Sequence, residues 1–285
     1  MATAAGTATP TVGPLLRDWR QRRRLSQLDV SARAAISTRH LSFLETGRAR
    51  PSREMVLHLA EELDVPLRER NTLLVAAGYA PVYQETPLMG DDMATVRETL
   101  RQLLASQEPN PALVVDRQWN LVLANRAVAL LIDGLPESLV APPVNVLRVS
   151  LHPDGLAPRI ANFEEWSGHL LSRLAREVTA TGDPGLTALY DELRAFPGVT
   201  EREHSGGAYL PRQQPAGRAV GVPHGDGASR LMVTLRLKSP IGELAFFSTV
   251  ATFGTAVDIT LAELSIESFF PADASTAATL RAALT

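Results

Sequence analysis

The chain has 285 residues, 31 acidic and 28 basic side chains, a formal net charge of −3 and no cysteine. The length predicts more than one domain, and a chain without cysteine has neither disulfides nor thiolate chemistry. No apolar run is long enough to span a bilayer, and the N-terminal residues lack the charged start and apolar core of a secretory signal. We therefore expect a cytoplasmic protein with no membrane partner.

The segment Leu25–Pro51 predicts two short helices joined by a tight turn. Ser26 and Ser37 each stand just before an apolar-periodic run, which is the position of a helix N-cap. We expect the second of these helices at Thr38–Glu45. Two short helices separated by three or four residues are typical of a DNA-reading helix-turn-helix.

Charge in the same region favours contact with DNA phosphates. From residue 17 to residue 53 there are ten arginines and three acids, a formal +7 within a chain of net −3. Arginine is abundant throughout this chain, but general abundance does not explain a positive excess confined to one segment. The sequence therefore predicts double-stranded DNA as a partner.

Residues 15–76 resemble the helix-turn-helix domains of phage repressor and Cro proteins, the XRE type. The likeness lies in Leu25-Ser26-Gln27, Leu41-Ser42, Leu44-Glu45, Gly47-Arg48, Pro51-Ser52 and Leu59-Ala60. It implies an ion pair between Glu45 and Arg20. Ala35 occupies the turn position where the family usually has glycine, so we expect either some backbone strain or a different turn.

The expected DNA-contacting side chains lie on and around the second helix of the motif. On a helical wheel, Leu41 and Leu44 point inward, so the outward side chains face DNA. Arg39 would read a guanine edge, or alternatively contact a phosphate, and Phe43 would touch a thymine methyl. The complete expected set is Gln27, Thr38, Arg39, His40, Ser42, Phe43, Arg48 and Arg50, with Gln27 assigned by the family likeness and Arg48 and Arg50 assigned to phosphates.

Further helices are expected at Glu54–Leu63 and Arg68–Ala76, which complete an all-α, five-helix, phage-repressor-like domain. A connector then leads to an amphipathic helix at about residues 91–107. Its apolar stripe would pack on its own domain or on a second copy of the chain, so a homodimer is one expectation. The expected boundaries are a disordered leader (1–14), the DNA-binding domain (15–80), a connector with its linking helix (81–108), a second domain (109–275) and a C-terminal tail (276–285).

The sequence predicts that the second domain belongs to the α+β class and contains an antiparallel sheet. A hairpin is expected at Ala112–Asp116 and Trp119–Ala124, followed by a helix at Asn125–Ile132. Later helices are expected at Phe163–Thr179 and Thr187–Ala195. Alternation of apolar residues predicts further strands at residues 231–237, Glu243–Val250 and Val257–Leu261, and residues 204–229 are expected to form a long mobile loop.

This order resembles the PAS-type sensor fold, and residues 12–275 resemble regulators that join a repressor-type helix-turn-helix to an MmyB-like, PAS-related ligand-binding domain. The segments that carry this resemblance include residues 74–81 (LVAAGYAP), 145–148 (NVLR), 151–156 (LHPDGL) and 269–271 (FFP). The resemblance implies a one-component regulator whose second domain binds a small apolar, fatty-acid-like ligand.

Residues expected at that ligand site are Trp119, Arg126, Leu147, Arg148, Phe163 and Trp166, with Leu121, Phe246 and Phe253 as further apolar candidates. Arg126, Arg148 or His152 would meet a carboxylate headgroup. An ordinary core role is the alternative for each apolar residue, and a structural role is the alternative for Arg148 and His152.

Catalytic and metal motifs are missing from the sequence. The six histidines form no HExxH pair, and there is no G-x-S-x-G elbow or phosphate-binding GxxxxGK[ST] loop. We therefore expect no enzymatic activity, no cofactor and no metal. Two hypotheses stay open: a ligand-sensing regulator, or a DNA-binding protein whose PAS-like domain serves only for dimerisation or protein interaction.

Overall fold

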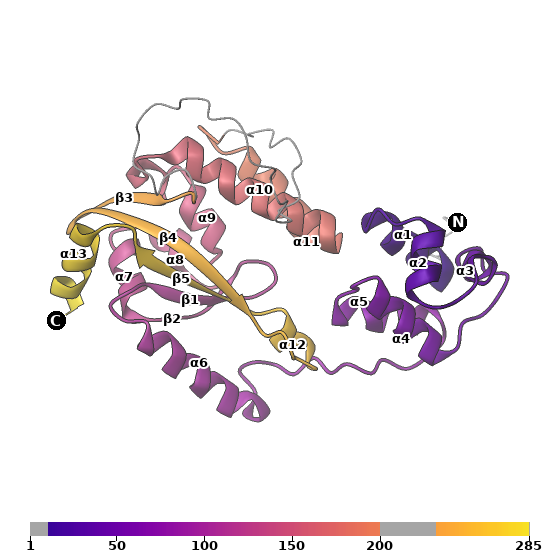
Figure 1. The fold of residues 1–285 in the computed structure, drawn as a ribbon. Coiled ribbons are helices and arrows are strands. Elements are labelled where there is room, and N and C mark those ends of the chain that lie inside the picture. The colour runs from indigo at the N-terminus through magenta and orange to yellow at the C-terminus, as the bar shows by residue number, and fades with distance from the viewer. Residues whose placement is uncertain (1–10, 200–231, 285) are drawn as a thin grey trace, which may run out of the picture. The chain divides into compact units, whose positions relative to one another are not determined.

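The computed structural model describes residues 11–199 and 232–284, which fall into two compact units (Figure 1). The first unit holds the described residues up to 94, together with 179–181 and 253–263. The second unit holds the other described residues. Within the described ranges, no helix has the length and apolar character needed to cross a membrane.

The first unit is built around five helices packed on one apolar core. They are α1 Val12–Arg22, α2 Gln27–Arg33, α3 Thr38–Glu45, α4 Arg53–Glu62 and α5 Leu67–Ala76. The side chains of Ser26, Ser37 and Ser52 each accept a hydrogen bond from a first-turn backbone amide, so serine caps set the starts of α2, α3 and α4. The expected all-α domain of five helices is confirmed.

The turn between α2 and α3 spans residues 34–37 and depends on an unusual alanine. Ala35 has φ of +51°, in the left-handed region. The amide of Ile36 donates to the carbonyl of Ser31, which closes the end of α2 as in a glycine-terminated helix. The expected backbone strain at Ala35 is therefore confirmed, since a Cβ disfavours this conformation.

The second unit contains a five-stranded sheet in the order β2-β1-β5-β4-β3, with every neighbouring pair antiparallel. The expected α+β class with an antiparallel sheet is confirmed. The strands are β1 Ala112–Val115, β2 Leu121–Ala124, β3 Leu235–Ser239, β4 Gly242–Thr252 and β5 Ser265–Pro271. Leu113 of β1 lies directly opposite Glu267 of β5, so these two side chains share a face of the sheet.

Helices cover the sheet. In Figure 1, α9 and α10 lie on one side of it and α6 on the other. The remaining elements of the chain are η1 Asp91–Met93, α6 Ala94–Ser106, α7 Arg126–Ile132, α8 Glu137–Val140, α9 Val146–Leu151, η2 Ala157–Arg159, α10 Phe163–Thr181, α11 Pro184–Arg194, α12 Ile259–Ala262 and α13 Ala274–Leu284. The core of this unit lies between the sheet and α7, α9, α10 and α11.

Two polar side chains fix the first hairpin of the second unit. Asp116 accepts hydrogen bonds from the amides of Gln118 and Asn120, which stabilises the tight connection between β1 and β2. The buried amide of Asn125 donates to the carbonyls of Leu104 and Asn110. Asn125 therefore ties the end of α6 to the start of the sheet.

Several expectations about the elements need correction. The strand expected at Val257–Leu261 is wrong: this stretch contains α12, and the fifth strand lies at Ser265–Pro271. The leader ends earlier than residue 14, because α1 begins at Val12, which is buried. The expected tail at 276–285 is mostly helix α13, which buries Leu280 in the core.

Other expectations change in extent. The linking helix is α6, at Ala94–Ser106, preceded by the short 3-10 turn η1. The expected connector (81–108) is divided, because residues up to 94 belong to the first unit and α6 from residue 95 to the second. Leu231 and the loop expected at 204–229 lie outside the described residues, and β3 begins at Leu235.

We predict that Ala35→Gly stabilises the first unit by about 1 kcal/mol, since glycine adopts positive φ without a Cβ penalty. The matched control is Ala32→Gly, because Ala32 is exposed within regular α2. That change should cost about 1 kcal/mol. Hydrogen exchange of the helices between residues 12 and 76 measures both effects. Destabilisation by both changes would contradict the strained turn.

Candidate functional site

The outer face of α3 presents a small cluster of polar and aromatic side chains. Thr38 and Arg39 are exposed, whereas His40, Ser42 and Phe43 are half-buried. The guanidinium carbons of Arg39 and Arg48 lie 5.3 and 5.9 Å from the centre of the Phe43 ring. The Phe43 ring therefore holds two arginines beside the face expected to meet DNA.

A buried ion pair supports that face from behind. Arg20 of α1 donates to both carboxylate oxygens of Glu45, from Nε at 2.6 Å and from Nη2 at 2.9 Å. Gln27 of α2 donates to the same carboxylate at 2.8 Å. Glu45 therefore joins α1 and α2 to the end of α3, and the expected Arg20–Glu45 pair is confirmed.

The protonation of Glu45 follows from these contacts. Its side chain is 2% exposed. Burial raises the pKa of Glu45, but hydrogen bonds from Arg20 and Gln27 and the positive charge of Arg20 outweigh it and hold the pKa below its usual value. Glu45 is therefore a carboxylate at neutral pH.

Two other expected DNA contacts already have partners within the chain. The amide of Gln27 is bound to Glu45, as described above. Arg50 is exposed but donates from Nη2 to the carbonyl of Ala77 at 3.0 Å, beyond the end of α5. A phosphate contact by Arg50 would use its other donors or replace this bond, so Arg48 is the simpler probe of phosphate binding.

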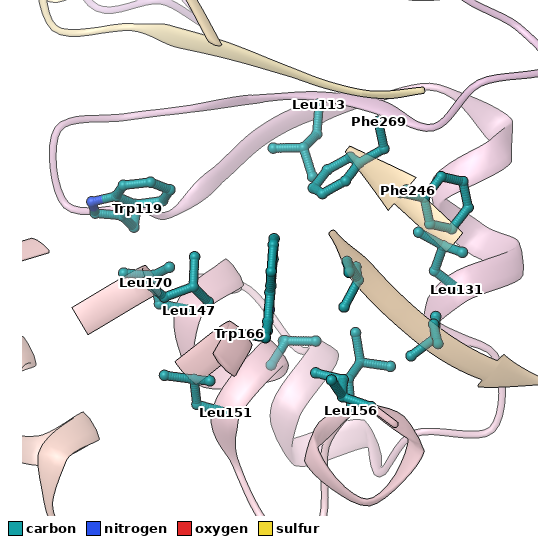
Figure 2. Packing of buried hydrophobic residues seen from close by; sticks show 14 of the residues in the cluster. Leu113, Trp119, Leu131, Leu147, Leu151, Leu156, Trp166, Leu170, Phe246 and Phe269 are labelled. Carbon is teal, nitrogen blue, oxygen red and sulfur yellow. The ribbon is translucent and has the colours of Figure 1, made fainter. Parts of the chain in front are cut away.

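The second unit contains a cavity of about 90 Å³ between the sheet and its helices. Residues from β1, β2, β3 and β5 line it on the sheet side, and residues from α7 to α10 line it on the helix side. Figure 2 shows Leu113 and Phe269 facing Trp166, Leu147 and Leu156 across this region. All lining side chains are apolar except those of Ser150 and Glu267.

A buried charge network lies at the cavity wall. Glu267 of β5 lines the cavity, and its side chain is 7% exposed. Arg173 of α10 donates to it at 3.1 Å and lies 3.4 Å from Glu177. The guanidinium carbon of Arg173 stacks 4.2 Å from the Trp119 ring centre, and the Trp119 indole donates to Glu177 at 2.8 Å.

Comparison with protein families identifies both units. A helix-turn-helix domain model matches residues 12–73, and the model of the MmyB-like transcription regulator ligand binding domain matches residues 96–283. The chain belongs to this MmyB-like family. It is thus a transcription regulator with a DNA-binding and a ligand-binding domain. No curated relative matches the sequence.

The cavity of this MmyB-like regulator lies within the matched ligand-binding domain. Among the expected ligand-site residues, Leu147 and Trp166 line the cavity, as does Leu121. Trp119, Phe163 and Phe246 belong to or pack against the surrounding core without lining the cavity. Phe253 falls in the first unit.

The expected headgroup residues do not line the cavity either. Arg126 pairs with Glu108 at 2.7 Å and is largely exposed, and Arg148 pairs with Glu192 at 2.6 Å. His152 accepts a hydrogen bond at Nδ1 from the amide of Asp154. These ion pairs and this turn are structural contacts, so a ligand role for the three side chains remains a proposal.

Sequence reasoning missed Glu267 at the cavity wall and its charge network with Arg173 and Glu177. One signal was present: Glu267-Ser268 stands between Ile266 and Phe269, in an otherwise apolar run. A carboxylate in the middle of a buried strand indicates a partnered or functional group. Its partner Arg173 is 94 residues away in sequence, and no spacing rule connects the two.

We predict that Glu45→Gln destabilises the first unit by about 3 kcal/mol at pH 7, because Arg20 then lacks its counter-charge in a buried site. The folded-state pKa of Glu45 is lowered, so its stabilisation is present above the usual pKa and is lost as pH falls through the folded value. The difference between the two proteins should therefore shrink in acid.

Hydrogen exchange of residues 12–76, at pH 7 and under acid conditions, measures this difference. The control is Glu61→Gln, an exposed acid of α4, which should change stability by less than about 0.5 kcal/mol. Equal stability of Glu45→Gln and Glu61→Gln at pH 7 would show that the Arg20–Glu45 pair contributes no net stabilisation.

For DNA, we predict that Arg39→Ala relaxes base preference and costs about 1–3 kcal/mol at the preferred site. Arg48→Ala should weaken all sequences alike and lower the salt slope by about 1. Selection from randomised duplexes, followed by titrations at several salt concentrations, measures both. An unchanged base preference in Arg39→Ala would show that this side chain does not read bases.

Proposed function

We propose that this regulator senses a small apolar molecule held in the cavity of its second unit and thereby changes its affinity for double-stranded DNA, acting as a homodimer in the cytoplasm. The observation that supports a ligand most directly is the cavity, whose wall is apolar apart from two side chains. Each methylene buried there contributes about 0.8 kcal/mol, so an alkyl chain binds without many polar contacts.

DNA recognition is proposed to follow the geometry of α3. Its exposed Arg39 and half-buried Phe43 and Ser42 are positioned for base edges, while Arg48 supplies phosphate contact. A dimer fits this role, because helix-turn-helix domains of this kind read paired half-sites about one helical turn apart.

Coupling between ligand and DNA requires that the ligand distinguishes two states of the protein. The chain provides a route for such coupling. Residues 253–263 belong to the first unit, where Arg68 of α5 pairs with Glu263 at 2.8 Å. Only Leu264 separates Glu263 from β5, the strand that brings Glu267 and Phe269 to the cavity. A ligand that shifts β5 would therefore also shift residues 253–263, which belong to the same unit as the DNA-binding helices.

The test begins with the purified full-length chain. Solvent extraction followed by mass spectrometry should release an apolar molecule close to one per chain. Adding this molecule back to protein freed of it should change DNA affinity by about 5-fold or more, the usual range of allosteric coupling. No extracted molecule under several growth conditions, together with unchanged DNA affinity, would instead favour a dimerisation or protein-interaction module.

We predict that Val140→Trp abolishes this response while leaving basal DNA binding intact. Val140 ends α8, is half-buried and lines the cavity, so an indole at this position fills the space that the ligand needs. Leu139→Trp is the matched control, because Leu139 is the preceding half-buried residue of α8 and does not line the cavity. Equal ligand responses in the two variants would contradict binding in this cavity.

A further inference from the structure

The size of the cavity restricts the size of its ligand. Its volume is about 90 Å³. A larger protein cavity of about 150 Å³, also lined by aliphatic and aromatic side chains, binds benzene. Leu113 and Phe269 enclose the present cavity from the sheet, and Leu147 and Trp166 enclose it from the helices (Figure 2). All four side chains are buried in the core, so the space admits a compact molecule and not a long chain.

The two polar side chains of the cavity wall already have partners within the protein. The Oγ of Ser150 accepts a hydrogen bond from the indole of Trp166 at 3.0 Å. Glu267 accepts hydrogen bonds from Arg173, at 3.1 Å, and from the hydroxyl of Ser248. Among the described residues, no buried side-chain nitrogen or oxygen lacks a hydrogen-bond partner. The wall therefore offers a bound molecule mainly apolar contacts.

A polar group buried in this cavity would lose its hydrogen bonds to water without gaining equivalent ones. Burial without such compensation disfavours a hydroxyl and disfavours a carboxylate far more. No basic side chain of the described residues lines the cavity to offset a negative charge. Apolar atoms instead gain dispersion contacts with wall atoms that otherwise face empty space. The wall therefore selects for a molecule without a polar group.

Resting on the proposed small-molecule function, we propose that the ligand of this cavity is a compact hydrocarbon-like molecule, apolar throughout and no larger than a single six-membered ring. This class differs from the fatty-acid-like ligand that the family resemblance implies, because the cavity has room for neither a long chain nor a buried carboxylate. Benzene serves as the probe for the compact class. Phenol adds one hydroxyl to the same ring, and decanoate represents a long chain with a carboxylate.

Methyl NMR on the full-length chain, freed of co-purified ligand by a hydrophobic resin, tests this proposal. Val128, Leu131 and Leu147 line the cavity, so their methyl resonances report on its contents. At pH 8 we expect benzene to shift these resonances to saturation. The half-saturating concentrations of phenol and decanoate should be higher by about 10-fold or more, because each would bury a polar group without a partner. Equal or tighter binding of phenol or decanoate, measured on the same resonances, would overturn the proposal.

Two leucine truncations connect the size limit to this cavity. Naphthalene is rigid and larger than benzene, so it should leave the Val128 and Leu131 resonances of the unmodified protein unchanged. Leu147→Ala enlarges the cavity, so naphthalene should then shift them. Leu193→Ala removes the same atoms from the same core at a residue that does not line the cavity, so naphthalene should have no effect. An equal response to naphthalene in the unmodified protein and in Leu147→Ala would overturn the size limit.

Failure of the underlying function gives a different result. If no probe shifts the cavity resonances, this inference falls, and if no apolar molecule is extracted from the protein either, the ligand-sensing function falls with it. If decanoate shifts the resonances at least as readily as benzene, ligand sensing stands and the proposal of a compact ligand falls. The comparison of benzene, phenol and decanoate in the unmodified protein decides the matter even if Leu147→Ala does not fold.

Discussion

Each unit of this protein buries a carboxylate against an arginine, and the balance of charge in these two pairs determines what each pair does. Glu45 has Arg20 to itself and a further donor in Gln27, so its negative charge is compensated and its pKa is lowered. Burial raises the pKa of Glu267 despite its contacts with Arg173, and the nearby charge of Glu177 adds to that rise. The first pair therefore holds a stable carboxylate, whereas in the second pair burial makes the carboxyl group harder to ionise.

The same contrast appears in how each pair relates to function. Glu45 lies at the end of α3, so the ion pair that fixes it also fixes the direction of the helix that carries Arg39 and Phe43. Any effect of Glu45 on DNA binding is therefore indirect: Glu45 orients α3 and does not itself contact DNA. Glu267 instead lines the cavity of the matched ligand-binding domain.

The first unit could be predicted almost completely from sequence because its signals are local. Serine caps, helical periodicity and the arginine excess each span only a few residues, and the Thr38–Glu45 helix was predicted with its observed bounds. Ala35 was identified as a position of either backbone strain or a different turn, and its positive φ in the structure corresponds to the first of these. DNA-contact roles for individual side chains stay predictions, since the chain forms internal contacts with some of the same groups, as Arg50 does with Ala77.

The sequence predicted the fold class of the second unit but not the position of every element, because the interactions that determine these positions join residues far apart in the sequence. The last strand was expected at Val257–Leu261, but this stretch contains α12 and the strand is β5. The cavity face of β5 carries both apolar and polar side chains, so the periodicity of apolar residues did not reveal the strand. The expected headgroup arginines, Arg126 and Arg148, stand within segments that carry the family resemblance. In the structure each has an acidic partner from another part of the chain.

Glu267 interrupts the apolar side chains of β5 and also lines the cavity. Placing Glu267 in a buried strand costs desolvation, which the network with Arg173 offsets only in part. Local violations of hydrophobic patterning are expected at functional or strained sites. In β5 this carboxylate lies four residues after Glu263, so the buried acid of the cavity wall and the acid that pairs with Arg68 belong to one continuous stretch of chain.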